Sequence, residues 1–169
     1  CLMSVKKWDA ALSLAENGIA TGFNDAEMNT LKGYALGALT RFSEAEISIT
    51  KAIEMDPNNA QAQMALSILY FYQGNWPSAW KNYEARWGLP SMTRRPHTQP
   101  QWQGQPIAGK KVLIWGEQGV GDEVMYASMI KDVLTLGAEI TFEMDPRLVP
   151  LFTRSYPEIK CIARHLVPT

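Results

Sequence analysis

The first half of the sequence repeats with a period of 34 residues. Aligning Ala26–Asn59 with the residues 34 positions later places Ala45 on Ala79 and Phe42 on Trp76. A period of this length fits one pair of helices, and such a pair buries its apolar face only by stacking on neighbouring pairs. The pattern therefore predicts a stack of helix pairs.

The unit Ala26–Asn59 resembles the consensus of the tetratricopeptide repeat (TPR), which has the same period. Three small residues and a proline stand at consensus positions: Gly33, Ala45, Ala52 and Pro57. Small side chains let paired helices approach closely, and proline ends a unit because it cannot continue a helix. One repeat earlier, Trp8, Ala11 and Ile19 fit the second helix of a unit whose first helix is almost wholly absent. We expect an all-α TPR superhelix over residues 1–88, with an incomplete first repeat.

The TPR resemblance implies a concave groove that binds a protein partner, because stacked helix pairs curve and expose one set of helices. The groove positions that it implies are Glu27, Thr30, Tyr34, Gln61, Met64, Ile68, Phe71 and Tyr72. TPRs that grip a carboxyl terminus use a clamp of Lys, Asn and Arg, and no such cluster stands at these positions. A second interpretation stays open, in which Met64, Ile68 and Phe71 simply pack against the neighbouring repeat or the second domain.

Residues 89–109 differ in composition from the repeats. They hold few periodic apolar residues and four prolines, which is typical of a linker: Pro90, Pro96, Pro100 and Pro106. We expect Trp102 to anchor this segment. Arg94 and Arg95 either reach an anionic ligand or are solvated, and no phosphate role is assigned to them.

The remainder, residues 110–169, is expected to be a partial Rossmann-like α/β unit with a three-stranded parallel sheet, so the chain is multidomain. Three apolar or alternating segments predict strands: Lys111–Trp115, Ala138–Glu143 and Ile159–Ala163. Helical spacing covers Val124–Leu136, and Asp145-Pro146 resembles the start of a second helix that runs roughly to Tyr156. Strands joined by helices imply right-handed crossovers and parallel pairing.

The loop Gly116–Asp122 separates the first of these strands from the helix after it. Its glycine spacing, G-x-x-G-x-G, matches neither the dinucleotide-binding nor the Walker motif, which argues against NAD and ATP. Glycines let backbone N–H groups approach a ligand, and a carboxylate at the helix start is stabilised as an anion. Asp122 is therefore either a general base for a sugar hydroxyl or an N-cap, and the two roles are compatible.

Four motifs resemble bacterial proteins in which TPRs precede a glycosyltransferase domain: Trp102–Pro106 (W-x-G-x-P), Gly109-Lys110, Glu117–Glu123 (EQGVGDE) and Asp145–Pro157. That domain is similar to the lipopolysaccharide heptosyltransferases, which are family 9-like enzymes with the two-halved GT-B fold. The resemblance implies that Asp122 is the catalytic base of the acceptor side. It implies an acceptor site shaped by Gly116, Glu117, Gln118, Gly119, Gly121 and Glu123.

By this resemblance, the full-length parent transfers a sugar from a nucleotide-sugar to a saccharide or protein acceptor. A GT-B enzyme binds the nucleotide-sugar mainly with its second half, whereas this chain ends at Thr169. We therefore expect a fragment that is inactive by itself and self-associates through its incomplete sheet. The alternative is a TPR module for protein interaction or scaffolding, with a degenerate α/β platform.

Composition excludes several other classes. The formal charge is −1 and 46% of the 169 residues are hydrophobic, which argues against a nucleic-acid partner and is typical of a soluble protein. No apolar run approaches the roughly 20 residues that span a bilayer. Two cysteines and two histidines lack the spacing of a metal site. We expect no metal or cofactor, and a cytoplasmic location.

Overall fold

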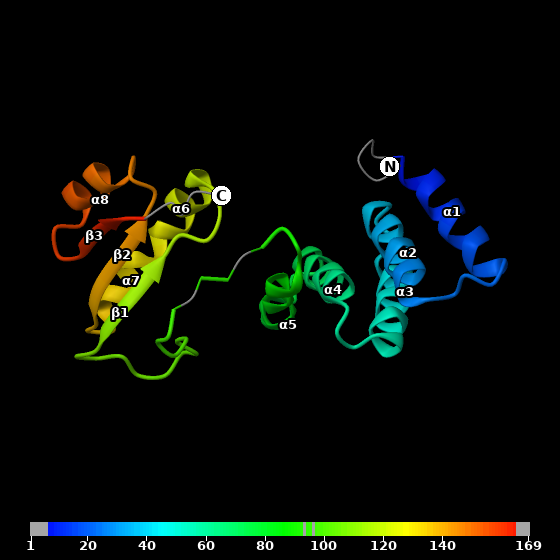
Figure 1. Ribbon diagram of the computed structural model, residues 1–169, viewed down its shortest axis with the longest axis horizontal. Coiled ribbons are helices and arrows are strands. Elements are labelled where there is room, and N and C mark those ends of the chain that lie inside the picture. The colour runs from blue at the N-terminus through cyan, green and yellow to red at the C-terminus, as the bar shows by residue number, and fades with distance from the viewer. Residues whose placement is uncertain (1–6, 93, 96, 165–169) are drawn as a thin grey trace. The chain divides into compact units, whose positions relative to one another are not determined.

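The computed structural model describes residues 7–92, 94–95 and 97–164. The chain forms two compact units, residues 1–97 and 98–169. The division between them lies inside the segment expected as a linker. Unit 1 is helical and unit 2 contains the sheet (Figure 1).

Unit 1 is a run of helices that each pack on their neighbours in sequence. They are α1 (Trp8–Ala20), α2 (Ala26–Ala38), α3 (Phe42–Met55), α4 (Ala60–Tyr72), α5 (Trp76–Tyr83) and the 3₁₀ helix η1 (Glu84–Gly88). Helices α1, α3 and α5 begin at intervals of 34 residues, and so do α2 and α4. The helical TPR-like superhelix predicted from the repeat is confirmed.

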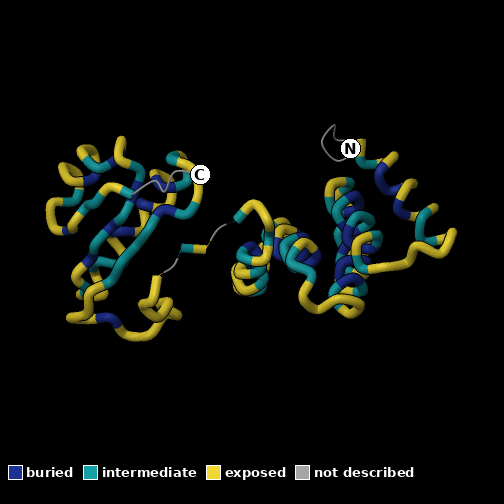
Figure 2. The backbone as a smooth tube through the Cα atoms, in the orientation of Figure 1, coloured by how far each residue is buried: buried dark blue, intermediate teal, exposed yellow. Residues whose placement is uncertain are grey.

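Small residues allow the helices of unit 1 to approach closely, as the sequence indicated. Ala45 and Ala52 of α3 are fully buried, and a Cβ at Gly33 of α2 would overlap the side chain of Ile49. Ile49 and Leu36 fill the space that remains, and burying each contributes on the order of 1.5–3 kcal/mol. Figure 2 shows this burial concentrated along the inner faces of the helices.

Unit 2 is a three-stranded parallel sheet, in the order β1-β2-β3. Its elements are β1 (Lys111–Trp115), α6 (Val120–Tyr126), the 3₁₀ helix η2 (Ala127–Met129), α7 (Ile130–Thr135), β2 (Glu139–Met144), α8 (Val149–Ser155) and β3 (Lys160–Ala163). Val112 pairs with Ile140, and Phe142 pairs with Cys161. The predicted parallel sheet is confirmed.

Alternate residues of β2 form the core of unit 2. Ile140, Phe142 and Met144 are buried on one face of the strand. They pack in one cluster with Ala127, Ile130, Leu148, Phe152 and Ile159. Because those partners come from η2, α7, α8 and the loops beside them, this face of the sheet is the one that the helical segments cover.

Two helix boundaries in unit 2 differ from the expectation. The helix expected over Val124–Leu136 starts at Val120 and is interrupted by η2. Apolar periodicity alone did not indicate this start, because Gly121, Asp122 and Glu123 follow Val120 in the first turn. The helix expected from Asp145 starts at Val149, since Asp145 Oδ1 accepts the Arg147 N–H at 3.0 Å and first forms a separate turn.

The linker is also anchored differently. Trp102 is exposed, and its indole N–H donates to the carbonyl of Gln105 within the same segment at 2.7 Å. Ile107 is the buried residue instead. Within the described ranges, no helix has both the length and the apolar character needed to cross a bilayer.

Candidate functional site

Unit 1 contains an open groove between α2, the start of α4 and the chain that follows η1. Ten residues line it: Asp25, Glu27, Met28, Thr30, Leu31, Tyr34, Gln61, Leu89, Pro90 and Ser91. Four positions implied by the TPR resemblance are among them, namely Glu27, Thr30, Tyr34 and Gln61. The wall formed by Leu89–Ser91 was not expected, because these residues lie in the segment interpreted as a linker.

The floor of this groove joins α2 to α4. The hydroxyl of Tyr34 donates to the carbonyl oxygen of Gln61 at 3.2 Å. Burial raises the pKa of Tyr34 above its usual value, so the hydroxyl stays protonated as a donor. Thr30 is buried beside it and donates to the Ala26 carbonyl at 2.7 Å. Both hydroxyl groups therefore already donate to backbone carbonyl oxygens in the floor of the groove.

The third wall is fixed by a close approach. A Cβ at Gly88 would lie 2.9 Å from Cβ of Ala60, so only glycine lets η1 end against the start of α4. Beyond it, the N–H of Leu89 donates to Arg86 O and the N–H of Met92 donates to Leu89 O, both at 3.0 Å. These two bonds hold Leu89–Ser91 in a turn beside the groove.

The other expected groove residues lie elsewhere. Phe71 makes edge-to-face contacts with Trp76 and Trp80 of α5, at centroid distances of 5.7 and 4.9 Å, so it packs within its own repeat. Tyr72 is exposed and stacks on Phe42 of α3 at 6.0 Å. Met64 is half-buried and Ile68 is exposed, and neither is among the residues that line the groove.

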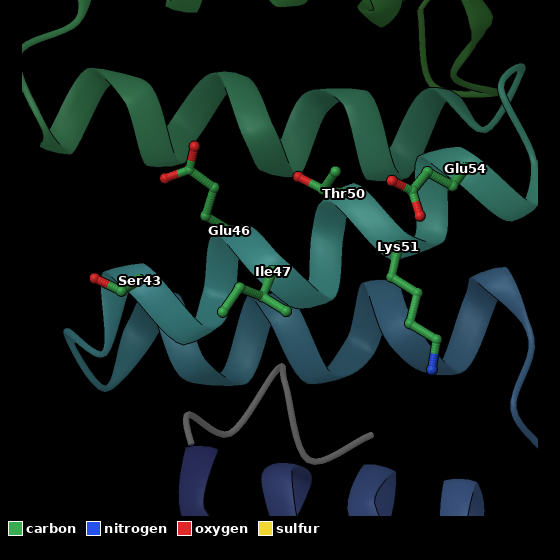
Figure 3. Close-up of a pocket in the computed structure, with 6 residues that line it drawn as sticks. All are labelled: Ser43, Glu46, Ile47, Thr50, Lys51 and Glu54. Carbon is green, nitrogen blue, oxygen red and sulfur yellow. The ribbon is translucent and has the colours of Figure 1, made fainter.

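A second, shallower hollow lies on α3 (Figure 3). Its six lining residues all belong to this one helix: Ser43, Glu46, Ile47, Thr50, Lys51 and Glu54. Glu46 accepts hydrogen bonds from Tyr70 and Gln73, both at 3.3 Å. The described lining residues of this hollow come from one helix, whereas those of the groove beside α2 come from three segments of the chain, so the groove is the better candidate for binding.

The candidate site of unit 2 lies where the three parallel strands end. The loop at 116–119 follows β1, Asp145 follows β2 and Arg164 follows β3. An ionic cluster joins them through Glu123 of α6. Arg164 Nη2 lies 3.0 Å from Glu123 Oε1 and 3.6 Å from Asp145 Oδ2, and the Asp145 N–H donates to Glu123 Oε2 at 2.8 Å.

Glu123 lies inside this cluster and is only 4% exposed. A side chain at Gly116 would overlap the Glu123 carboxylate, and Arg164 also donates to the Gly116 carbonyl at 3.3 Å. Glu123 thus helps to position the loop through its contact with Gly116 and its ion pair with Arg164. The neighbouring aspartate of the cluster is bonded to Arg147, whose side chain holds the pKa of Asp145 well below its usual range.

Asp122 is half-buried in the first turn of α6. The N-cap of this helix is Gly119, which makes no side-chain cap, so the interpretation of Asp122 as the N-cap is wrong. The other expected contact residues of the loop differ in exposure. Gln118, Gly119 and Gly121 are exposed, whereas Glu117 is half-buried. The described residues contain no group of three or more His, Cys, Asp or Glu side chains suited to a metal ion.

Asp145 and Arg164 belong to this site although the sequence patterns did not predict them there. Both directly follow a strand, as the loop at 116 does. Since the carboxyl ends of parallel strands meet at one edge, that shared placement could have identified them.

No family model matches the chain. Protein FlbA of Caulobacter vibrioides is 31% identical over 134 residues, covering 73% of this chain and 22% of FlbA. The chain therefore spans about a fifth of the length of this curated relative. Residues 1–97 and 98–169 are each shorter than the matched stretch, so the similarity extends into both units.

Two solved structures are similar to part of the chain. The second TPR of Spaghetti (RPAP3) bound to the HSP90 peptide SRMEEVD is 21% identical, with a TM-score of 0.46, and the match covers 50% of this chain and 78% of that one. MamA AMB-1 is 25% identical, with a TM-score of 0.44, and the match covers 52% of this chain and 48% of that one.

Proposed function

We propose that unit 1 is a protein-binding module whose groove takes an extended segment of a partner protein. The observation that carries this proposal is the three-sided groove between α2, the start of α4 and Leu89–Ser91. Its floor combines apolar side chains with hydroxyls that are already bonded, and its rim is polar. Surfaces of stacked helix pairs commonly bind other proteins in this way.

Selection from a random dodecapeptide display library tests this function on the full chain. Gln61 is exposed on the rim, so a Gln61→Trp variant narrows the groove without adding charge. Thr50→Trp on the hollow of α3 is the matched control (Figure 3). We expect enriched peptides to lose binding to Gln61→Trp and to keep binding to Thr50→Trp.

Ser91→Trp places a large side chain on the third wall of the groove, and we expect it to block the same peptides. This second variant shows that a loss of binding in Gln61→Trp is not caused by a change confined to Gln61. Circular dichroism establishes that each variant is folded. Peptides that bind all three variants as well as the unchanged chain would remove the support for a binding groove.

A second candidate function rests on Asp122. We propose that in a full-length parent this carboxylate takes the proton from an acceptor hydroxyl, while a nucleotide-sugar supplies the sugar. A half-buried aspartate beside a glycine loop, at the carboxyl edge of a parallel sheet, favours this assignment. A saccharide or a protein would be the acceptor, and the loop at 116–121 would shape the site that binds it.

Sugar transfer by the full-length parent tests the second candidate. Asp122→Asn removes the base and keeps the shape, so we expect transfer to fall by about two orders of magnitude or more. Asp132→Asn makes the same change at an exposed position of α7 and serves as the control. Full activity in Asp122→Asn, or absence of transfer by the parent, would count against this role.

A further inference from the structure

We infer that the groove of unit 1 selects a partner segment in which lysine or arginine side chains stand among apolar ones. This inference rests on the proposed protein-binding function and adds the chemical class of the partner. It follows from the charges on the rim and the side chains of the walls.

The charged side chains that line the groove are both carboxylates, Asp25 and Glu27. Asp25 uses one oxygen to accept the N–H of Met28 at 2.8 Å, and a carboxylate can accept further bonds. Glu27 is exposed on the same rim. A cation placed between these two groups would meet charge of the opposite sign on both.

Apolar surface makes up much of the rest of the groove. Met28 and Leu31 come from α2, and Leu89 and Pro90 face them from the third wall. All but Pro90 are half-buried, so they offer contact area without being part of the closed core. An extended partner segment places alternate side chains on one side, which suits a pattern of basic and apolar residues.

An acidic partner segment fits the same groove poorly. None of the ten lining residues is Lys, Arg or His. A carboxylate entering the groove would lose water next to Asp25 and Glu27, and none of the described lining residues would offer it a cation. The charges of the groove therefore favour binding of basic segments over acidic ones.

Three synthetic peptides test this inference by fluorescence anisotropy with the full chain. They share length and leucine positions, and carry lysine, serine or glutamate at the remaining positions. We expect the lysine peptide to bind about tenfold more tightly than the serine peptide, and the glutamate peptide not to saturate. Raising the salt concentration is expected to weaken the lysine peptide most.

Charge reversal at the rim makes the test specific. We expect Glu27→Lys to weaken binding of the lysine peptide about tenfold and to strengthen binding of the glutamate peptide. Glu54→Lys makes the same change on the exposed face of α3 and is expected to leave both unchanged. Glu27→Gln is the milder variant, because it disturbs the first turn of α2 less.

The outcomes separate this inference from the function on which it rests. Equal affinity for the lysine and serine peptides, with both blocked by Gln61→Trp, would overturn the charge preference and keep the binding groove. An equal loss in Glu54→Lys would also overturn it, because attraction would then follow net charge alone. If Gln61→Trp blocks none of the peptides, both proposals fall.

Discussion

Thr40 and Gly74 occupy the same position of successive repeats and share a left-handed backbone, with φ angles of 61° and 74°. Each directly follows the C-cap of its helix, and its N–H together with that of the next residue closes the helix end with two backbone bonds, the arrangement of a Schellman motif. The bonds run from Thr40 N to Gly37 O, Arg41 N to Leu36 O, Gly74 N to Phe71 O and Asn75 N to Tyr70 O. The turn is therefore kept in both repeats, although Thr40 carries a β-branched side chain.

Thr40→Gly is expected to stabilise unit 1 by about 1 kcal/mol. A non-glycine residue costs on the order of 1–2 kcal/mol in the left-handed region, and the greater freedom of glycine in the unfolded chain offsets part of the gain. Urea unfolding followed by circular dichroism measures the change. Thr50→Gly, in the exposed middle of α3, should instead destabilise by roughly 0.3–0.5 kcal/mol. Destabilisation by both variants would contradict this account.

Gly33→Ala is expected to destabilise unit 1 by about 1–3 kcal/mol, because the new Cβ overlaps Ile49. Gly37→Ala, one turn later in α2, is the control. Its Cβ would find Ala45 Cβ at 4.0 Å, so the helix propensity of alanine should prevail and stabilise by up to about 1 kcal/mol. Thermal unfolding of both variants measures whether Gly33→Ala lowers and Gly37→Ala raises the stability of unit 1. Ile49→Ala removes both Ile49 atoms near the new Cβ, Cγ1 and Cδ1. The double variant Gly33→Ala with Ile49→Ala should therefore be less destabilised than the sum of the two single variants, and strict additivity would exclude overlap as the cause.

Much of unit 1 could be predicted from the sequence because its helices are local and recur at a fixed interval. Gly33 and Ala45 report the close helix contact through their size alone. The groove was only half predictable. Its α2 side follows from the repeat, whereas Leu89–Ser91 reach it through the approach of Gly88 to Ala60, which no periodic pattern records.

In unit 2 the strands were predictable from short apolar runs, but the role of Glu123 was not. Its sequence context places it in an exposed loop motif. In the structure it is buried, with an ion pair to Arg164 and a hydrogen bond from the Asp145 N–H. These partners are distant in sequence, and burial of a charge depends on them. The prediction that Asp122 caps the helix was also wrong. The N-cap is Gly119, so the helix starts earlier than the apolar pattern indicated.

Glu123→Gln is expected to destabilise unit 2 by about 3 kcal/mol. Removing one charge of a buried pair leaves the other poorly compensated, and the side chains of Glu123 and Arg164 are 1% and 14% exposed. Glu158→Gln, at an exposed position, should change stability by less than about 0.5 kcal/mol. The double variant Glu123→Gln with Arg164→Gln should be less destabilised than the sum of the single variants. Equal unfolding midpoints for Glu123→Gln and the unchanged chain would indicate that Glu123 does not hold the loop.

Self-association through the sheet remains a proposal. In the sheet that the described residues form, strands β1 and β3 are the two edges, and edge strands offer backbone groups to another chain. We expect light scattering at micromolar concentration to show a dimer or a larger species. A clean monomer across a concentration series would contradict self-association.

Acid should weaken unit 2 through Asp145. Hydrogen bonds from Arg147 lower the pKa of this carboxyl below its ordinary value of 3.8. A lowered pKa in the folded state stabilises the fold above the ordinary value, and that contribution is lost as pH falls below 3.8 towards the folded pKa. Urea unfolding between pH 5 and pH 2 should therefore show a falling midpoint that is shallower in Asp145→Asn and in Arg147→Gln. Asp132→Asn removes a carboxylate from an exposed position of α7 and controls for the loss of charge. If Asp145→Asn and Asp132→Asn flatten the pH dependence equally, the bonds to Arg147 are not its source.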